Sequence, residues 1–160
     1  MPRDFLTLYP PLNLRPAPLK IKQQDDGSGR PAVFDPLRRR WVALTPEEWV
    51  RQHFVAMLIA EKGYPASRVA NETSITLNGT SRRCDTVVFD SHCCPLIIVE
   101  FKAPSVTVSQ KTFDQIVRYN MVLKARYLVV SNGLHHFCAE VSYNEKSYRF
   151  LEDIPPYSAT

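Results

Sequence analysis

The feature that most constrains this sequence is a pair of short apolar runs separated by a turn. The first run extends from Thr86 to Phe89 and the second from Leu96 to Val99, and residues 90–95 between them include Asp, Ser and Pro. β-Branched residues dominate both runs, and runs of this length bounded by turn residues are typical of buried strands. The pattern therefore predicts an antiparallel hairpin whose strands are largely buried.

Three charged residues interrupt this hairpin: Asp85, Glu100 and Lys102. A buried carboxylate is costly unless another group pairs with it, so the three need a common explanation. Glu100 and Lys102 are two residues apart in a strand and project from the same face, which Asp85 can reach from the neighbouring strand. Two carboxylates beside one ammonium form a hard-oxygen site for a divalent cation such as Mg²⁺, with Lys102 placed to orient or deprotonate a water.

An amphipathic helix is expected before the hairpin. Thr45 is a suitable N-cap, Pro46 suits the first helical position and Glu48 completes a Thr-x-x-Glu capping box. The apolar residues that follow at helical spacing are Val50, Phe54, Met57 and Leu58. The sequence Gly63-Tyr64-Pro65 ends the helix.

A second helix is expected from about Ser109 to Lys124, after the hairpin. Residues 107–110 offer a second possible capping box. The residues on one stripe of this helix are Thr112, Ile116, Tyr119 and Leu123.

Short strands account for most of the remaining chain. They are expected near residues 19–23, 33–36, 40–44, 69–77, 127–130, 135–141 and 148–151. The resulting order is hairpin, helix, three strands, helix, strand, hairpin. This order predicts an α/β (α+β) fold with a mixed central sheet flanked by helices, extra hairpins at both ends, and the charged site at one end of the central strands.

The length of 160 residues is that of one domain. Prolines in the first 18 residues favour an extended arm over residues 1–33, either packed on the body or disordered. The folded domain is expected over residues 34–152 and a tail over residues 153–160.

Composition excludes several classes of protein. The net charge of +4 permits a polyanionic partner without requiring one. No apolar run has the length needed to cross a bilayer, no leader is present, and the four cysteines lack a Cys-x-x-Cys spacing, so we expect a cytoplasmic protein with reduced thiols. A Gly-x-x-x-x-Gly-Lys phosphate loop is absent, which excludes an ATP-driven motor from this chain.

Four sequence blocks together resemble a known family. In chain order they are Leu44–Gln52, Arg83–Asp85, Val99–Pro104 and Gln115–Asn120. They resemble the N-terminal nuclease domain of type I restriction enzyme R (restriction) subunits, within the PD-(D/E)xK nuclease superfamily. The likeness extends from Phe34 to Tyr157 and implies a restriction-endonuclease-like core.

The resemblance implies a Mg²⁺-dependent deoxyribonuclease, with Mn²⁺ as a substitute ion. Asp85, Glu100 and the carbonyl oxygen of Phe101 are the implied metal ligands, and Lys102 would stabilise or activate the attacking water. Gln115 and Tyr119 lie four residues apart on the second helix, and a Gln-x-x-x-Tyr helix after Glu-x-Lys resembles a variant in which these two side chains orient the cluster. The implied partners are DNA and other restriction-modification subunits, with no membrane partner; the oligomeric state is unknown.

Four further residues are weaker candidates. Glu47 is in phase with Arg51, which places it on or beside the buried stripe of the first helix. Enzymes of this superfamily often place an extra carboxylate there, although Glu47 is equally well explained as a helix-terminus acid. Arg82, Arg83 and Arg118 are candidates for phosphate contacts, and each is equally well explained as a surface charge.

Two other hypotheses explain the same residues. One is a nucleic-acid-binding or assembly module that keeps the nuclease core without catalysis, and the other is a domain in which the hairpin charges form an ion-pair network. The presence of all five residues of the implied core favours catalysis, because a module without chemistry has no reason to bury charges.

Overall fold

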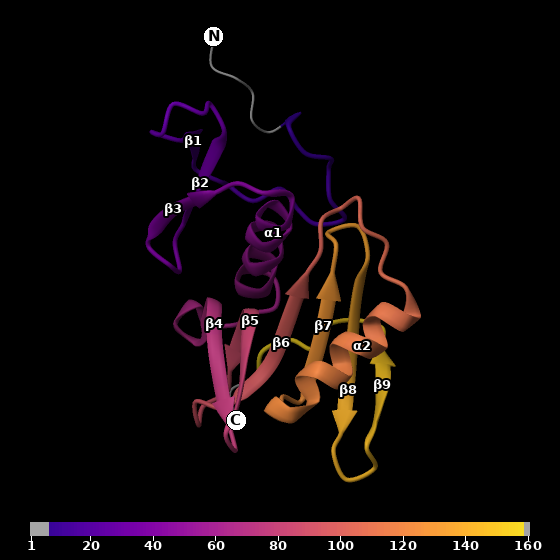
Figure 1. The fold of residues 1–160 in the computed structure, drawn as a ribbon. Coiled ribbons are helices and arrows are strands. Elements are labelled where there is room, and N and C mark those ends of the chain that lie inside the picture. Colours follow the sequence, from indigo (N-terminus) through magenta and orange to yellow (C-terminus); the bar gives the residue numbers. More distant parts are fainter. Residues whose placement is uncertain (1–6, 159–160) are drawn as a thin grey trace.

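The computed structural model describes residues 7–158, which form two β-sheets and two α-helices (Figure 1). The first sheet is antiparallel and consists of β1 (Ile21–Gln23), β2 (Pro31–Asp35) and β3 (Arg40–Ala43). The second sheet has six strands in chain order: β4 (Val69–Leu77), β5 (Thr80–Phe89), β6 (Pro95–Phe101), β7 (Tyr127–Ser131), β8 (His136–Ser142) and β9 (Ser147–Leu151). The helices are α1 (Pro46–Ala60) and α2 (Gln110–Asn120), with 3₁₀ turns at Ala66–Arg68 and Met121–Leu123.

The six-stranded sheet is mixed, as predicted. Its neighbouring strands are antiparallel except β6 and β7, which run parallel and are connected through α2. The predicted hairpin of β5 and β6 is confirmed, and both strands are interior. The predicted C-terminal hairpin forms from β8 and β9. It is not additional to the central sheet, because β8 pairs with β7 and the hairpin completes that sheet.

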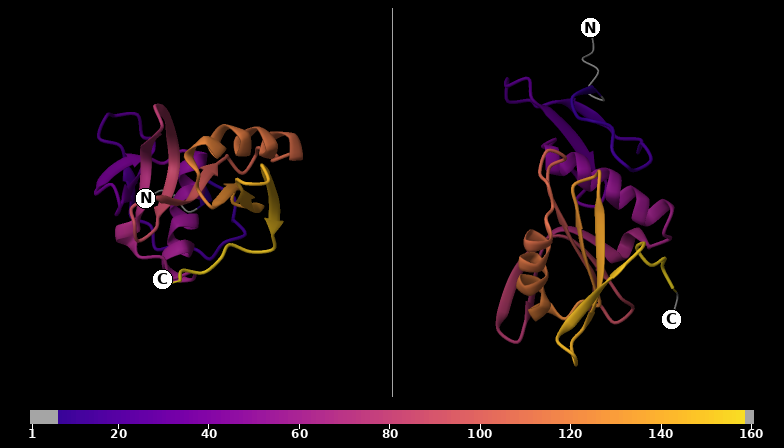
Figure 2. Two further views of the ribbon diagram at one scale, coloured as in Figure 1. Left: turned by 90° about the horizontal axis from the view of Figure 1, so that it is seen from below. Right: turned by 90° about the vertical axis from the view of Figure 1, so that its right-hand side faces the viewer.

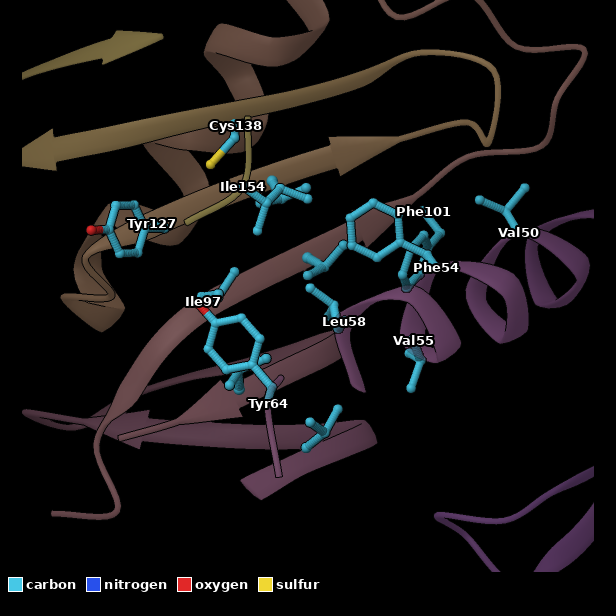
Figure 3. Packing of buried hydrophobic residues seen from close by; sticks show 14 residues of the cluster. Val50, Phe54, Val55, Leu58, Tyr64, Ile97, Phe101, Tyr127, Cys138 and Ile154 are labelled. Atoms are coloured by element: carbon cyan, nitrogen blue, oxygen red, sulfur yellow. The ribbon is translucent and has the colours of Figure 1, made fainter. Parts of the chain in front are cut away.

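The two helices cover opposite faces of this sheet (Figure 2). From α1, Val50, Phe54 and Leu58 are fully buried against one apolar cluster that includes Phe101 of β6 (Figure 3). The other face carries a separate cluster that includes residues of α2. Burial of a large aliphatic or aromatic side chain stabilises a fold by roughly 1.5–3 kcal/mol, so these contacts fix both helices on the sheet. Within residues 7–158, no helix has the length and apolar character needed to cross a membrane.

The predicted cap of α1 is confirmed in part. Thr45 Oγ1 accepts a hydrogen bond from the backbone N–H of Glu48 at 3.1 Å, and Pro46 occupies the first turn. The side chain of Glu48, however, bonds Arg38 and Gln52. Capping therefore does not account for the Glu48 carboxylate.

The prediction for α2 needs two corrections. Its N-cap is Ser109, whose side chain accepts from the backbone N–H of Thr112, and not Thr107. The side chains that α2 buries are Phe113, Val117 and Asn120. The first three residues of the predicted stripe are therefore displaced by one position, because the large ring of Phe113 packs on the sheet and turns Tyr119 outward. The fourth, Leu123, is buried as predicted.

The described part of the N-terminal arm packs on the body. Trp49 Nε1 donates to the carbonyl of Pro10 at 3.2 Å, and Asn13 N donates to the carbonyl of Gly133 at 2.9 Å. The arm also contributes β1, and β2 crosses the expected boundary at residue 33. At the other end of the chain, Tyr157 N donates to the carbonyl of Lys62. Residues 1–6 and 159–160 lie outside the described part.

Candidate active site

Asp85 and Glu100 lie at the same end of the β5–β6 pair. Toward this end the last paired residues are Thr86 and Val99, so one step further Asp85 comes opposite Glu100. Asp85 Oδ2 accepts a hydrogen bond from the backbone N–H of Phe101 at 2.8 Å. The carboxylate thus binds the backbone of β6 at the point where the regular pairing of the two strands ends.

Lys102 completes this group of charges. Its Nζ lies 3.3 Å from Glu100 Oε1, and both side chains are 33% exposed. The two residues therefore share a face at the carboxyl end of β6, as their spacing predicted. An ammonium that remains partly open to solvent stands beside one of the two carboxylates.

The surroundings of Asp85 oppose its ionisation. Burial raises the pKa of Asp85 above its ordinary value and the charge of Glu72 adds to the rise, while the Phe101 N–H, Arg51 and Lys102 oppose it. The net rise means that the cost of burying the Asp85 carboxylate is not fully offset by its hydrogen bond and the nearby cations. A further cation at this position would therefore be stabilising.

Glu72 is a neighbour of Asp85 that the sequence did not reveal. It lies on β4 between the pairs Asn71–Thr86 and Thr73–Cys84, which places it opposite Asp85 on the side away from Glu100. Its backbone is left-handed, with φ 51°, an unusual conformation for a residue other than glycine. In a strand with alternating polar and apolar residues, an acidic residue is normally interpreted as facing solvent. The sequence pattern therefore did not identify Glu72 as a site residue.

Two arginines hold the Glu72 carboxylate. Arg51 of α1 donates to Oε1, and Arg83 of β5 lies 3.0 Å from Oε2. Burial raises the pKa of Glu72, but the hydrogen bonds and charges of Arg51 and Arg83 bring it below its ordinary value. Glu72 thus stays ionised and is committed to these two cations.

Helix α1 contributes Glu48 and Arg51 to the interior, not Glu47. Glu48 is 5% exposed, Arg51 is 4% exposed, and Arg51 Nε lies 3.4 Å from Glu48 Oε2. The expected position of Glu47 on or beside the buried stripe is wrong, because its side chain is exposed. One residue of helix turns a side chain by about 100°, and the cations Arg38 and Arg51 draw Glu48 inward instead.

Gln115 and Tyr119 are both exposed on α2. Tyr119 is 52% exposed, and the guanidinium of Arg82 lies 4.3 Å from its ring centroid. Within residues 7–158, no hydrogen bond joins Gln115 or Tyr119 to Asp85, Glu100 or Lys102. The predicted roles of Gln115 and Tyr119 remain predictions.

The three candidate phosphate-binding arginines lie on β5 and α2. Arg82 stacks on Tyr119, the side chain of Arg83 is 71% exposed, and Arg118 is exposed in the last turn of α2. Their guanidinium groups are therefore accessible to an anion. Their role in DNA binding also stays a prediction.

The donor set suits a hard divalent ion. Asp85 Oδ1 and Glu100 Oε2 make no hydrogen bond within the described residues, so each carboxylate keeps one oxygen available. Nowhere in residues 7–158 do three His, Cys, Asp or Glu side chains gather closely enough to hold an ion. A cation at this site would therefore rely on two carboxylates and backbone oxygen, the ligands that Mg²⁺ accepts together with water.

Comparison with known proteins relates the chain to one family and to solved structures. The family model described as type I restriction enzyme R protein N terminus (HSDR_N) matches residues 46–155. The chain also resembles the solved structure of a fragment assigned to an HsdR subunit of a type I restriction enzyme from Vibrio vulnificus YJ016. That match has a TM-score of 0.49 and 20% identity, and it covers 71% of this chain and 24% of the other. The chain thus spans a small part of the length of that structure. No protein with a curated description matches the chain.

Proposed function

Since the chain belongs to the family of type I restriction enzyme R protein N-terminal domains, we propose that it is a Mg²⁺-dependent deoxyribonuclease domain. The observation that supports this proposal is that Asp85, Glu100 and Lys102 lie at the same end of the β5–β6 pair, with Lys102 paired to Glu100. Two carboxylates with available oxygens and one ammonium are the groups that phosphodiester hydrolysis needs.

Asp85, Glu100 and the carbonyl oxygen of Phe101 would hold Mg²⁺, or Mn²⁺ in its place. The ion supplies Lewis acidity, which stabilises negative charge on the phosphate in the transition state. The Phe101 N–H holds Asp85 Oδ2 and so orients the other oxygen of that carboxylate. The raised pKa of Asp85 supports the proposal, because a carboxylate that lacks positive charge gains from a bound cation.

Lys102 is the residue placed to act on the reacting groups. In hydrolysis, a water oxygen attacks phosphorus, a P–O bond of the DNA backbone breaks, and the departing oxygen gains a proton. The Lys102 ammonium, 3.3 Å from Glu100, stabilises the developing negative charge, or in its neutral form takes the proton of the attacking water. Gln115 and Tyr119 would orient this cluster, and Arg82, Arg83 and Arg118 would bind flanking phosphates.

Other subunits of a restriction-modification enzyme are the partners that the family suggests. Phosphate contacts hold a protein on DNA without reading the sequence. Target choice would then rest with partner subunits or with a longer chain that contains this domain.

A catalytically idle nucleic-acid-binding or assembly module is the second candidate. The exposed positions of Gln115 and Tyr119, together with the ion pair between Glu100 and Lys102, favour it. An idle module would bind DNA with or without a divalent ion and would leave every phosphodiester bond intact.

A cleavage assay distinguishes the two candidates. Linear, supercoiled and single-stranded DNA would each be incubated with the protein and Mg²⁺, Mn²⁺ or a chelator. We expect cleavage only with the ions, and a rate lower by roughly 10²-fold or more in Asp85→Ala and Lys102→Ala. Cleavage that survives both substitutions would come from a contaminant or another centre, and intact DNA under all conditions would favour the idle module.

A further inference from the structure

The three-stranded sheet has one buried face and one open face. Ile21, Val33 and Val42 form a row across β1, β2 and β3 and pack into the apolar cluster around Trp49. The next row contains Phe34 paired with Trp41, and alternation turns both rings to the opposite face. Lys20 and Lys22 of the β1 segment lie beside these rings. We call Lys20, Lys22, Phe34 and Trp41 the cation–aromatic face.

The rings and ammonium groups of this face are interleaved. Lys20 Nζ lies 5.9 Å from the centroid of the Phe34 ring, and Lys22 Nζ lies 4.8 Å from that of Trp41. The two rings meet edge to face with centroids 5.6 Å apart. Trp41, one of the two tryptophans in the chain, has 41% of its surface exposed. An indole left open to solvent beside two cations offers both a stacking surface and charge.

Positive charge concentrates in this part of the chain. Residues 20–43 contain six Lys or Arg and three Asp, so they carry +3 of the net charge of +4. Asp35 is fully buried and Asp26 pairs with Arg30, while Asp25 pairs with Lys22. Within the described residues, Lys20, Arg39 and Arg40 form no ion pair. The excess charge is therefore available to a polyanion.

An apolar hollow of about 270 Å³ adjoins the cation–aromatic face. Phe34 and Lys20 line it on the side of the sheet, and Val55 and Ile59 of α1 line the other side. Both ribbon views place this sheet at the α1 end of the molecule, away from α2 (Figures 1 and 2). The face is thus separate from the surface that carries Arg118 and Tyr119.

We propose that the cation–aromatic face binds single-stranded nucleic acid. Unpaired bases would stack on Trp41 and Phe34, and the phosphates between them would meet Lys20 and Lys22. A duplex keeps its bases stacked on one another and cannot offer a base plane to Trp41. An acidic peptide matches the charge but leaves the indole without a planar partner. Binding at this face is independent of hydrolysis at Asp85.

The test is a titration with labelled 12-nucleotide oligothymidylate in chelator, so that cleavage plays no part. We expect binding by the full chain with quenching of tryptophan fluorescence, because Trp41 is exposed whereas Trp49 is 5% exposed. Trp41→Ala should weaken the affinity roughly tenfold, because stacking on an aromatic side chain carries much of single-strand binding. Trp41→Phe should restore most of the affinity without the quenching.

The matched control for the aromatic change is Phe150→Ala, since Phe150 is 46% exposed on β9. It should leave the affinity within about twofold of the wild type, which is small compared with the loss of one stacked base.

For the charges, joint replacement of Lys20 and Lys22 by Gln should lower the slope of log affinity against log salt by about 1.4. The same change at Lys111 and Lys146, both exposed elsewhere, should leave the slope unchanged.

Parallel titrations with oligouridylate, duplex DNA of the same length and polyglutamate identify the ligand class. Oligouridylate should bind comparably, and the other two more weakly. Equal binding of the duplex, or of polyglutamate with the same dependence on Trp41, would overturn the proposal, as would full affinity in Trp41→Ala. These outcomes are independent of whether the cleavage assay succeeds.

Discussion

The protein alone does not fully stabilise the ionised form of Asp85. Its hydrogen bond to the Phe101 N–H and the charges of Arg51 and Lys102 are outweighed by burial and by Glu72. The pKa of Asp85 is higher in the folded protein than in the unfolded chain. At pH values between these two pKa values, the native state therefore binds more protons than the unfolded state. Stability is therefore lost as the pH rises from the unfolded pKa through the folded pKa.

Asp85→Asn should consequently stabilise the protein at pH 7. Asn keeps an oxygen for the Phe101 N–H and removes the buried charge. The gain should disappear below the ordinary value of 3.8, where Asp85 is protonated in both states. Thermal unfolding at several pH values measures this, with Asp25→Asn, at an exposed position, as the control. A loss of stability at pH 7 would show that the carboxylate is adequately paired.

The part of the site that lies on two adjacent strands was predictable from the sequence. A hairpin and the alternation of a strand were enough to place Asp85, Glu100 and Lys102 at the same end of β5 and β6. Glu72 and Arg51 were not predictable, because one depends on a left-handed residue within β4 and the other on how α1 crosses the sheet.

At the scale of elements, α2 begins at a residue that the sequence left ambiguous. Both Thr107 and Ser109 are N-cap types, and only Ser109 accepts a hydrogen bond from a first-turn N–H. Ser109→Ala should therefore cost about 1 kcal/mol in the free energy of unfolding, and Thr107→Ala within about 0.5 kcal/mol of zero. Chemical denaturation of both variants decides the point. Equal losses would contradict the cap seen in the structure.

The sequence left the buried face of α2 ambiguous, as it left the first residue of the helix ambiguous. Phe113 and Val117 are buried. The predicted stripe instead included Thr112 and Ile116, which are only partly buried. Helical spacing alone fits either face of α2, and contact with the sheet chooses between them. For α1 the apolar residues Val50, Phe54 and Leu58 left one choice, and the prediction was right.

Across the whole molecule, a line of polar contacts joins the two sheets. Asp35 of β2 accepts a hydrogen bond from Asn71 at 2.9 Å, and Asn71 accepts one from Thr86 at 2.7 Å. Arg38 binds both Asp35 and Glu48. These contacts tie the N-terminal sheet to the strands that carry the site.

Asp35→Ala should therefore destabilise the protein by roughly 3–5 kcal/mol, because it leaves the Arg38 charge poorly paired in a buried place. Denaturant unfolding followed by circular dichroism should show a single transition at lower denaturant. Asp25→Ala, at an exposed pair with Lys22, should change stability by less than about 0.5 kcal/mol. A variant that unfolds in two steps would show that the sheets are independent.

The order of elements was predictable, but not how their edges meet. Local patterns located the strands, and nothing in them indicated that β8 pairs with β7 or that β1 adds to the N-terminal hairpin. Strand pairing between distant segments depends on burial and on the twist of the sheet, which a single sequence does not display.

The proposed hydrolysis depends on the binding of one divalent cation by Asp85 and Glu100 together. Titration with Mn²⁺, followed by electron paramagnetic resonance of the free ion, tests it directly. We expect the wild-type protein to bind Mn²⁺, with Mg²⁺ as a competitor. Asp85→Asn and Glu100→Gln should each weaken this binding at least about tenfold, since each removes a charged ligand, and Arg118→Gln should leave it unchanged. Equal Mn²⁺ binding by Asp85→Asn and the wild type, or no binding by either, would contradict the proposal.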